Sequence, residues 1–125
     1  MDIFIVITVI LFISLYTIHA YSTKNNAKMI NTLLRQTARW ATASQQDTNP
    51  FIANLHSNYA QAYYMALTDL YSEIEIFIAS GIDSKELSKK ISYIQDTSMM
   101  KLAGICPEGK PKDEFLVSIA KQGQR

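Results

Sequence analysis

His56, one of two histidines in this 125-residue sequence, is of a type that could do chemistry. A histidine acts as a general base or a metal ligand when a second ligand or a nucleophile lies one helical turn away. Ile52, Tyr59 and Ala60 hold the neighbouring helical positions, and none of them supplies such a group. We therefore expect His56 to be a surface or half-buried residue of a helix.

Asp69 and Glu73 are a carboxylate pair four residues apart, which places both on one face of a helix. Two carboxylates on one face can offer oxygens to a hard cation. A di-metal site in a helical bundle needs a Glu-x-x-His motif or a second acidic pair, and the sequence has neither. We expect a solvated acidic face, or a partner for Arg35 and Arg39, and no metal or cofactor.

Cys106 is the only cysteine, so no internal disulfide can form. It precedes Pro107 after a predicted helix end, where no helix N-terminus activates the thiol. The chain also lacks a phosphate-binding loop, a Cys-x-x-Cys motif and a serine nucleophile elbow. The sequence therefore predicts a free thiol and a protein that is not an enzyme.

The stretch from Ile3 to Tyr21 consists almost entirely of apolar residues and contains no Asp, Glu, Lys or Arg. As a helix it would be about 28 Å long, close to the hydrocarbon thickness of a bilayer. Residues 1–22 are thus predicted to be a transmembrane anchor, and residues 23–125 one small helical domain. The alternative is a signal peptide cleaved after Ala20. Ile18 and Asp2 argue against it, because such a leader has small residues before the cut and a basic start.

Four cations follow the apolar stretch: Lys24, Lys28, Arg35 and Arg39. Basic residues stay on the cytoplasmic side, so we expect a single-pass protein with its N-terminus outside and its body in the cytoplasm. We expect these four side chains to contact anionic lipid headgroups, at about 1 kcal/mol for each charge near the surface. The net charge of +1 gives no electrostatic case for a specific nucleic-acid partner.

Apolar residues recur at three- and four-residue steps along most of the remaining chain. Helices are expected near 26–46, 50–80 and 83–103, with a short C-terminal helix near 112–121. Asn49 and Pro50 predict the start of the second, Gly81 its end, and Asp83 the start of the third. The expected core positions are Ile30, Leu33, Leu34, Thr37, Ala38 and Ala41, then Ile52, Leu55, Tyr59, Ala62, Ala66, Leu70, Ile74 and Phe77, then Leu87, Ile91, Ile94, Ser98 and Leu102. Tyr63, Leu67 and Ile78 widen the stripe of the second helix.

Each of these helices has one apolar face, so none is stable alone. Short links make neighbouring helices antiparallel. The predicted fold class is all-α: an N-terminal transmembrane helix followed by a small up-down bundle of about three antiparallel helices. The alternative is that a partner chain completes the faces. No Pro or Gly separates the span from the next helix, so the two could be continuous.

The block ARWATASQQDTNP at 38–50, followed by LHSNYA at 55–60 and ALTD at 66–69, resembles small single-span proteins of large double-stranded DNA viruses of algae and protists. The resemblance implies a virion or membrane-associated structural protein. It implies no catalytic residues.

Three hypotheses follow. The first is a membrane-anchored helical protein that docks to a protein partner or to itself, as a virion membrane or capsid-associated component. The second is a secreted or lumenal helical binding module released near Ala20. The third is a small enzyme or metal protein that uses His56 with Asp69 or Glu73. It is disfavoured because His56 and Asp69 are about 20 Å apart on a straight helix.

Overall fold

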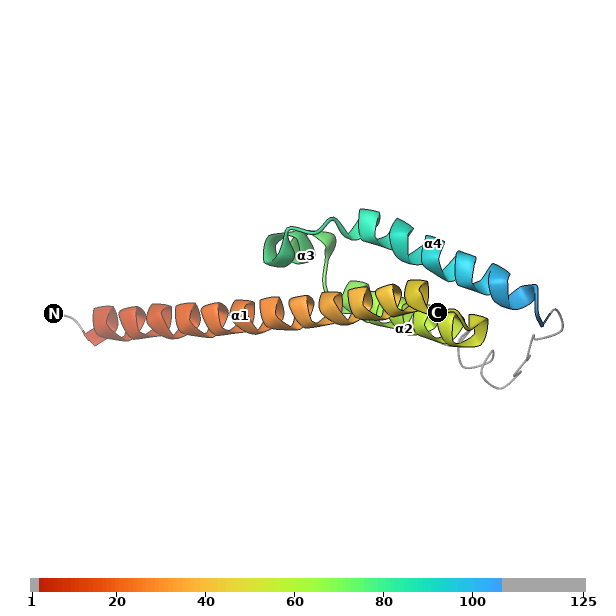
Figure 1. Ribbon diagram of the computed structural model, residues 1–125. Helices are drawn as coiled ribbons and strands as arrows, with labels where there is room; N and C mark the ends of the chain where they lie inside the picture. Colours follow the sequence, from red (N-terminus) through yellow and green to blue (C-terminus); the bar gives the residue numbers. More distant parts are fainter. Residues whose placement is uncertain (1–2, 107–125) are drawn as a thin grey trace, which may run out of the picture.

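The computed structural model describes residues 3–106, and this part of the chain is helical with no strands. The helices are α1 (Ile3–Gln46), α2 (Pro50–Leu70), α3 (Glu73–Ser80) and α4 (Ser84–Ala103), as Figure 1 shows. The predicted all-α class is thus confirmed for these residues. The helix expected near 112–121 lies outside them.

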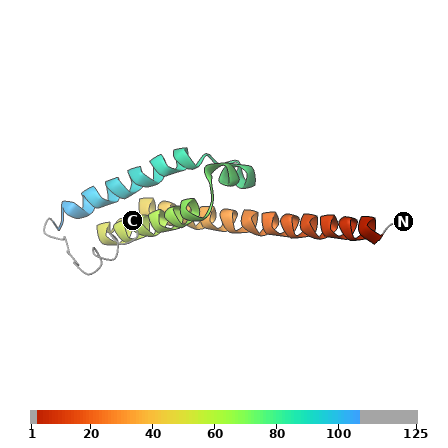
Figure 2. The ribbon, with the colours of Figure 1, turned by 180° about the vertical axis from the view of Figure 1, so that it is seen from behind.

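Helix α1 has 44 residues and is about 66 Å long. The apolar stretch and the helix expected near 26–46 are one continuous element, because no Pro or Gly breaks the backbone ladder. Every residue from Ile3 to Asn25 is exposed, and this half projects beyond the other helices (Figures 1 and 2). It is long and apolar enough, by length and composition, to cross a membrane.

Helix α2 turns back along the second half of α1. Asn49 caps its N-terminus as expected, because its side chain accepts from the Phe51 amide at 3.0 Å. Pro50 then takes a helical position whose missing N–H removes no hydrogen bond.

Small side chains form the contact between α1 and α2. Ala41 and Ser44 are buried on α1, and Ala53, Ser57 and Ala60 are buried on α2. Short side chains let the two backbones approach, and the Ser44 hydroxyl donates to the carbonyl oxygen of Ala53 at 2.7 Å. Ser57 is satisfied in the same way, with its hydroxyl 2.7 Å from that of Ser98. The buried hydroxyls therefore cost little, since each has a partner.

The core stripe expected on the second helix is wrong for α2. Ile52, Leu55, Tyr59 and Leu70 are exposed, whereas the buried residues are the small Ala53, Ser57 and Ala60. Leu67, expected at the edge of the stripe, is also buried, so this position is confirmed. The sequence carries two faces with helical spacing, one of large apolar and one of small side chains. Hydrophobicity favours burial of the face with large apolar side chains. Only the face with small side chains permits the close approach of α2 to α1. Leu33, Leu34 and Ala41 of the expected α1 stripe do lie in or against the core, although Ala38 is exposed.

The helix expected over 50–80 is also wrong, because it breaks after Leu70. Tyr71 has extended backbone, and Ser72 starts α3 with a reciprocal capping box. The Glu75 amide donates to the Ser72 hydroxyl, and the Glu75 carboxylate accepts from the Ser72 amide at 2.8 Å. A straight helix would have carried Ile76 away from the core, and the break turns it inward.

Helix α3 lies against α1. Ile76 is fully buried in a cluster with Ile30, Leu34 and Leu67. The Asn31 side-chain amide donates to the Ala79 carbonyl at 3.3 Å. The outer residues Ile74, Phe77 and Ile78 are exposed, so the expected core positions Ile74 and Phe77 are wrong.

Gly81 ends α3 with φ +72°, the left-handed conformation that glycine tolerates and that the sequence predicted. Asp83 caps α4 and accepts from the Lys85 and Glu86 amides. The Glu86 carboxylate lies 3.2 Å from the Lys90 ammonium group, one turn along α4. Helix α4 packs on α1 and α2 through Leu87, Ile91, Ile94 and Ser98, as expected. Figure 1 shows α4 running antiparallel to α2.

We expect Ile76→Ala to lower the free energy of unfolding of the body by about 2–5 kcal/mol, because it empties a fully buried site. Denaturant unfolding of the full chain in detergent micelles, followed by Trp40 fluorescence, measures this. Ile78→Ala is the matched control, since the same side chain on the same helix is 78% exposed there. Equal losses in the two variants would contradict the position of α3.

The hydrogen bonds at the start of α3 make its stability depend on pH. The Ser72 backbone amide and then the Ser72 hydroxyl lower the pKa of Glu75, and a small desolvation opposes them. A carboxyl whose pKa is lowered by folding stabilises the folded state above its unfolded pKa, and this contribution is lost as the pH falls through the folded pKa. We therefore expect the difference in α3 amide-exchange protection between wild type and Glu75→Gln to shrink on acidification through that range.

Hydrogen exchange of the 73–80 amides between pH 6 and pH 3 provides the measurement. Asp96→Asn, which changes an exposed carboxylate of α4, serves as the control and should track wild type throughout. A difference between wild type and Glu75→Gln that stays constant with pH would contradict the capping box.

Candidate functional site

His56 lies in an aromatic cluster where α1 and α2 meet. Its ring centroid is 5.0 Å from that of Trp40, and the centroid of Tyr59 is 5.1 Å from that of Trp40. The Nδ1 atom of His56 lies 2.5 Å from an Asp47 carboxylate oxygen. The His56 and Asp47 side chains are 22% and 29% exposed, so the expected half-buried position is confirmed for His56.

The His56–Asp47 pair resembles two members of a hydrolase triad in its hydrogen bond alone. A triad also needs a hydroxyl or thiol at the free Nε2 atom. The described neighbours of the His56 ring are Trp40 and Tyr59, which pack against it. The sequence reasoning missed Asp47 because it lies in the link between two helices, where helical spacing identifies no neighbours. The arrangement joins the end of α1 to the start of α2.

The expected acidic face does not assemble into one site. Asp69 is at the end of α2, whereas Glu73 lies on α3, 3.2 Å from the Lys85 ammonium group. Glu75 caps α3. Residues 3–106 contain no group of three His, Cys, Asp or Glu side chains placed to hold a metal ion. Within that range the ion pairs of Lys or Arg are those of Lys85 with Glu73 and of Lys90 with Glu86. The expected alternative in which the acidic residues pair with Arg35 and Arg39 is therefore not observed there.

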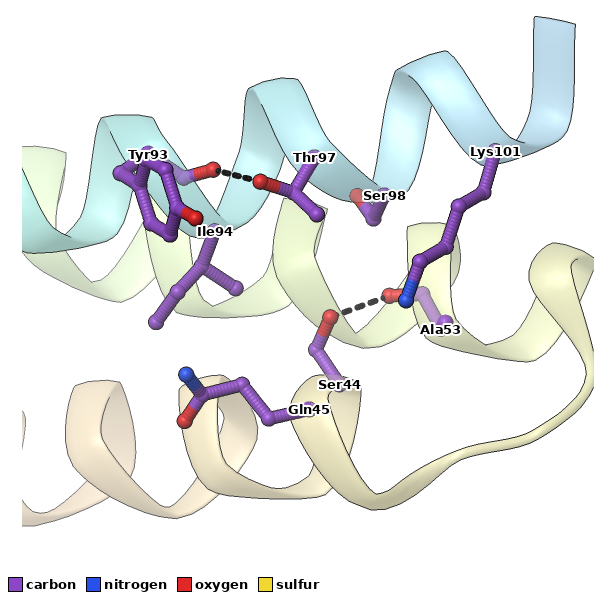
Figure 3. A pocket seen from close by; sticks show the side chains of 8 residues that line it. All are labelled: Ser44, Gln45, Ala53, Tyr93, Ile94, Thr97, Ser98 and Lys101. Atoms are coloured by element: carbon purple, nitrogen blue, oxygen red, sulfur yellow. Dashed lines mark hydrogen bonds between the residues drawn. The ribbon is translucent and has the colours of Figure 1, made fainter.

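A shallow cavity of about 250 Å³ opens between α4 and the α1–α2 hairpin (Figure 3). The Ser44 and Thr97 hydroxyls are already engaged: Ser44 donates to the carbonyl oxygen of Ala53, and Thr97 donates to the Tyr93 carbonyl at 2.8 Å. Lys101 and Gln45 also line it. One cation without a base or a nucleophile offers polar contacts to a small molecule but no catalytic pair.

The four cations after the apolar stretch lie on one exposed face of α1. Lys24, Lys28, Arg35 and Arg39 are spaced by four, seven and four residues, which keeps them on one side of a helix. The Arg39 guanidinium carbon is 5.5 Å from the Trp40 ring centroid. The sequence pattern and the structure agree that these side chains reach solvent.

Their heights along α1 separate these cations into two pairs. Lys24 and Lys28 lie about 5 and 10 Å beyond Tyr21, within or near one headgroup layer. Arg35 and Arg39 lie about 21 and 27 Å beyond Tyr21, and an average tilt of about 20° shortens this little. If α1 stood upright in a membrane with Tyr21 at its surface, only Lys24 and Lys28 would reach the headgroups.

An exposed apolar surface of the described body lies on α2, away from its small buried residues. We call this the α2 outer face, made of Phe51, Ile52, Leu55, Tyr59, Ala62, Tyr63, Ala66 and Leu70. Its large side chains are between 36% (Tyr63) and 65% (Leu70) exposed. In Figure 2, α2 lies nearest the viewer, and no other described helix covers it. Residues 51–68 contain no Asp, Glu, Lys or Arg.

The link between α1 and α2 can be tested with Asp47→Ala, His56→Ala and the double variant. Because both side chains are mostly buried and directly bonded, we expect a coupling energy of about 0.5–1 kcal/mol in the free energy of unfolding. Denaturant unfolding of the three variants and wild type closes the cycle. Additive losses would show that the two side chains do not interact in solution.

Comparison with models of protein families, with curated proteins and with solved structures finds no match to this chain. Three exposed surfaces of the described residues bear on its function. They are the apolar first half of α1, the four cations of α1 (Lys24, Lys28, Arg35 and Arg39) and the α2 outer face.

Proposed function

We propose that this protein is a membrane-anchored, single-pass helical interaction protein without catalytic activity, whose body stands on the cytoplasmic side. The observation that carries the proposal is the exposure of α1. The same helix that packs Ile30, Leu34 and Ala41 into the body leaves all of its preceding apolar residues uncovered.

The cost of leaving that surface in water supports a membrane span. Twelve strongly apolar residues lie between Ile3 and Ile18, nearly all of them more than 50% exposed. At about −0.3 to −0.6 kcal/mol each near the bilayer centre, they favour insertion by several kcal/mol. The hydroxyls of Thr8, Ser14 and Thr17 donate to carbonyl oxygens of the same helix, so they add little cost.

The cations after the span support the orientation. Lys24 and Lys28 are exposed and stand at headgroup height, where retention of basic residues favours the cytoplasmic side. The N-terminus is then outside.

The body offers a docking surface, and the proposed role is to hold that surface at a fixed distance from the membrane. The continuous α1 supports this role, because it joins span and body without a flexible linker. A virion membrane or capsid-associated setting is part of the proposal only through the resemblance in residues 38–69.

We expect the full chain to stay in the membrane pellet after carbonate extraction at high pH, because α1 is held by hydrocarbon contacts and not by charge. Cys106 is exposed and is the only cysteine, so a membrane-impermeant maleimide reports the side on which the body lies. We expect no labelling of intact cells and full labelling after permeabilisation.

Replacement of Leu11 and Ile13 by lysine, in the middle of the span, should release the chain to the soluble fraction. Met99→Lys and Met100→Lys on α4 add the same charge away from the span. A soluble wild-type chain would refute the anchor, and labelling of intact cells would refute the orientation. A mature chain beginning at Tyr21 would instead favour the module released after Ala20.

A further inference from the structure

The α2 outer face has the spacing of a parallel helix pair. Ile52, Leu55, Tyr59, Ala62 and Ala66 recur at alternating steps of three and four residues, the pattern by which two helices interlock side chains. In the folded chain Ile52, Leu55 and Ala62 are exposed, because the opposite face carries Ser57 and Ala60 into the core. The Tyr59 ring packs with its edge against Trp40 of α1. Apart from this contact, the pattern is largely unused within the described part of the protomer.

The anchoring membrane is a poor occupant for this face. Helix α2 runs alongside α1 (Figures 1 and 2), so its outer face stands along the membrane normal and does not lie on the membrane surface. The face also begins at Ile52, next to the distal end of α1. A membrane that receives α1 leaves most of it in water.

We propose that the α2 outer face is the interface of a parallel dimer, and that its occupant is a second copy of this chain. The inference rests on the proposed anchor, because two copies in one membrane share the same direction and can be related only by an axis along the membrane normal. Such an axis brings each α2 position opposite the same position of the partner copy. Identical residues can meet here without like-charge repulsion, since residues 51–68 contain no Asp, Glu, Lys or Arg.

The size of the face suits a partner held in the same membrane. A helix of 21 residues offers a strip of about 30 Å by 10 Å. A single helix face of this length is smaller than an interface that buries roughly 800 Å² of accessible surface per partner, as stable interfaces in solution do. Confinement to one bilayer raises the effective concentration of the two copies and compensates for the small area. A second copy of this chain satisfies that condition.

The dimer places the two spans apart. Packed helices have axes about 8–10 Å apart, and α1 packs on the flank of α2 that carries Ala53, Ala60 and Leu67, not on the outer face. The two α1 helices are then separated by at least about 20 Å, beyond the roughly 7 Å between Cα atoms that a disulfide can bridge. This separates the α2 interface from association through the membrane spans.

Disulfide cross-linking of the full chain in nanodiscs and in native membranes tests the proposal in a Cys106→Ser background. We expect Ala62→Cys to form a disulfide-linked dimer on mild oxidation. Leu11→Cys in the span and Met100→Cys on the outer side of α4 should remain monomeric. Cross-linking through Leu11→Cys without Ala62→Cys would overturn the interface.

Leu55→Lys provides the second measurement, because a parallel dimer sets the two lysines against each other. We expect the dissociation constant of the dimer, measured by fluorescence energy transfer in nanodiscs, to rise at least about tenfold. Met100→Lys, at another exposed apolar residue, should change it less than about twofold. Circular dichroism checks that both variants remain folded. Equal effects of the two lysines would overturn the proposal.

The proposed membrane anchor and the proposed dimer can be disproved independently of each other. A full chain that resists carbonate extraction but is monomeric overturns the dimer and keeps the anchor. A soluble chain that still cross-links through Ala62→Cys overturns the anchor and keeps the interface. A third outcome is that the full chain is monomeric, whereas a variant without residues 107–125 dimerises. The C-terminal segment of the same chain would then occupy the face, which also overturns the proposal.

Discussion

The rest of the structure depends on the contact of small side chains between α1 and α2. Ala41 and Ala60 share one buried cluster, and the Ser44 hydroxyl bonds the carbonyl oxygen of Ala53. Close backbone approach forms many weak dispersion contacts at once. It also fixes the rotation of α2 about its own axis. Once that rotation is set, Leu67 must face the core, and the bulky residues of α2 must face outward.

The second constraint is the break at Tyr71 and Ser72. Helix α2 alone would end beside α1 with Leu34 and Ile30 only partly covered. The capping box of Ser72 and Glu75 satisfies the free amides of α3 and lets it start in a new direction. Ile76 then closes the cluster of Ile30, Leu34 and Leu67. A polar motif at the surface thus completes the hydrophobic core near the end of the body that faces the proposed membrane.

The elements of this fold were largely predictable because their signals are local. Asn49 with Pro50, Gly81 and Asp83 mark helix ends by hydrogen bonding and backbone conformation, and the structure confirms each of them. The stripe of α4 was predictable because it has only one apolar face. The buried side of α2 was not predictable, because two faces of α2 have the same helical spacing. Which of the two is buried depends on the shape of α1. Nor did the sequence reveal the bond between His56 and Asp47, which joins a helix to a link. Ser72 and Glu75 do form a Ser-x-x-Glu signal, but the unbroken apolar spacing across it favoured a continuous helix.

The uninterrupted α1 has a mechanical consequence in the proposed setting. The part of the helix beyond Tyr21 rises about 37 Å with no Gly or Pro to absorb a bend. A span that is long for its bilayer accommodates the mismatch by tilting. In a rigid helix the tilt passes undiminished to the body, and about 20° of tilt moves its far end sideways by about 13 Å. The protein thereby converts local bilayer thickness into the lateral position of its surface.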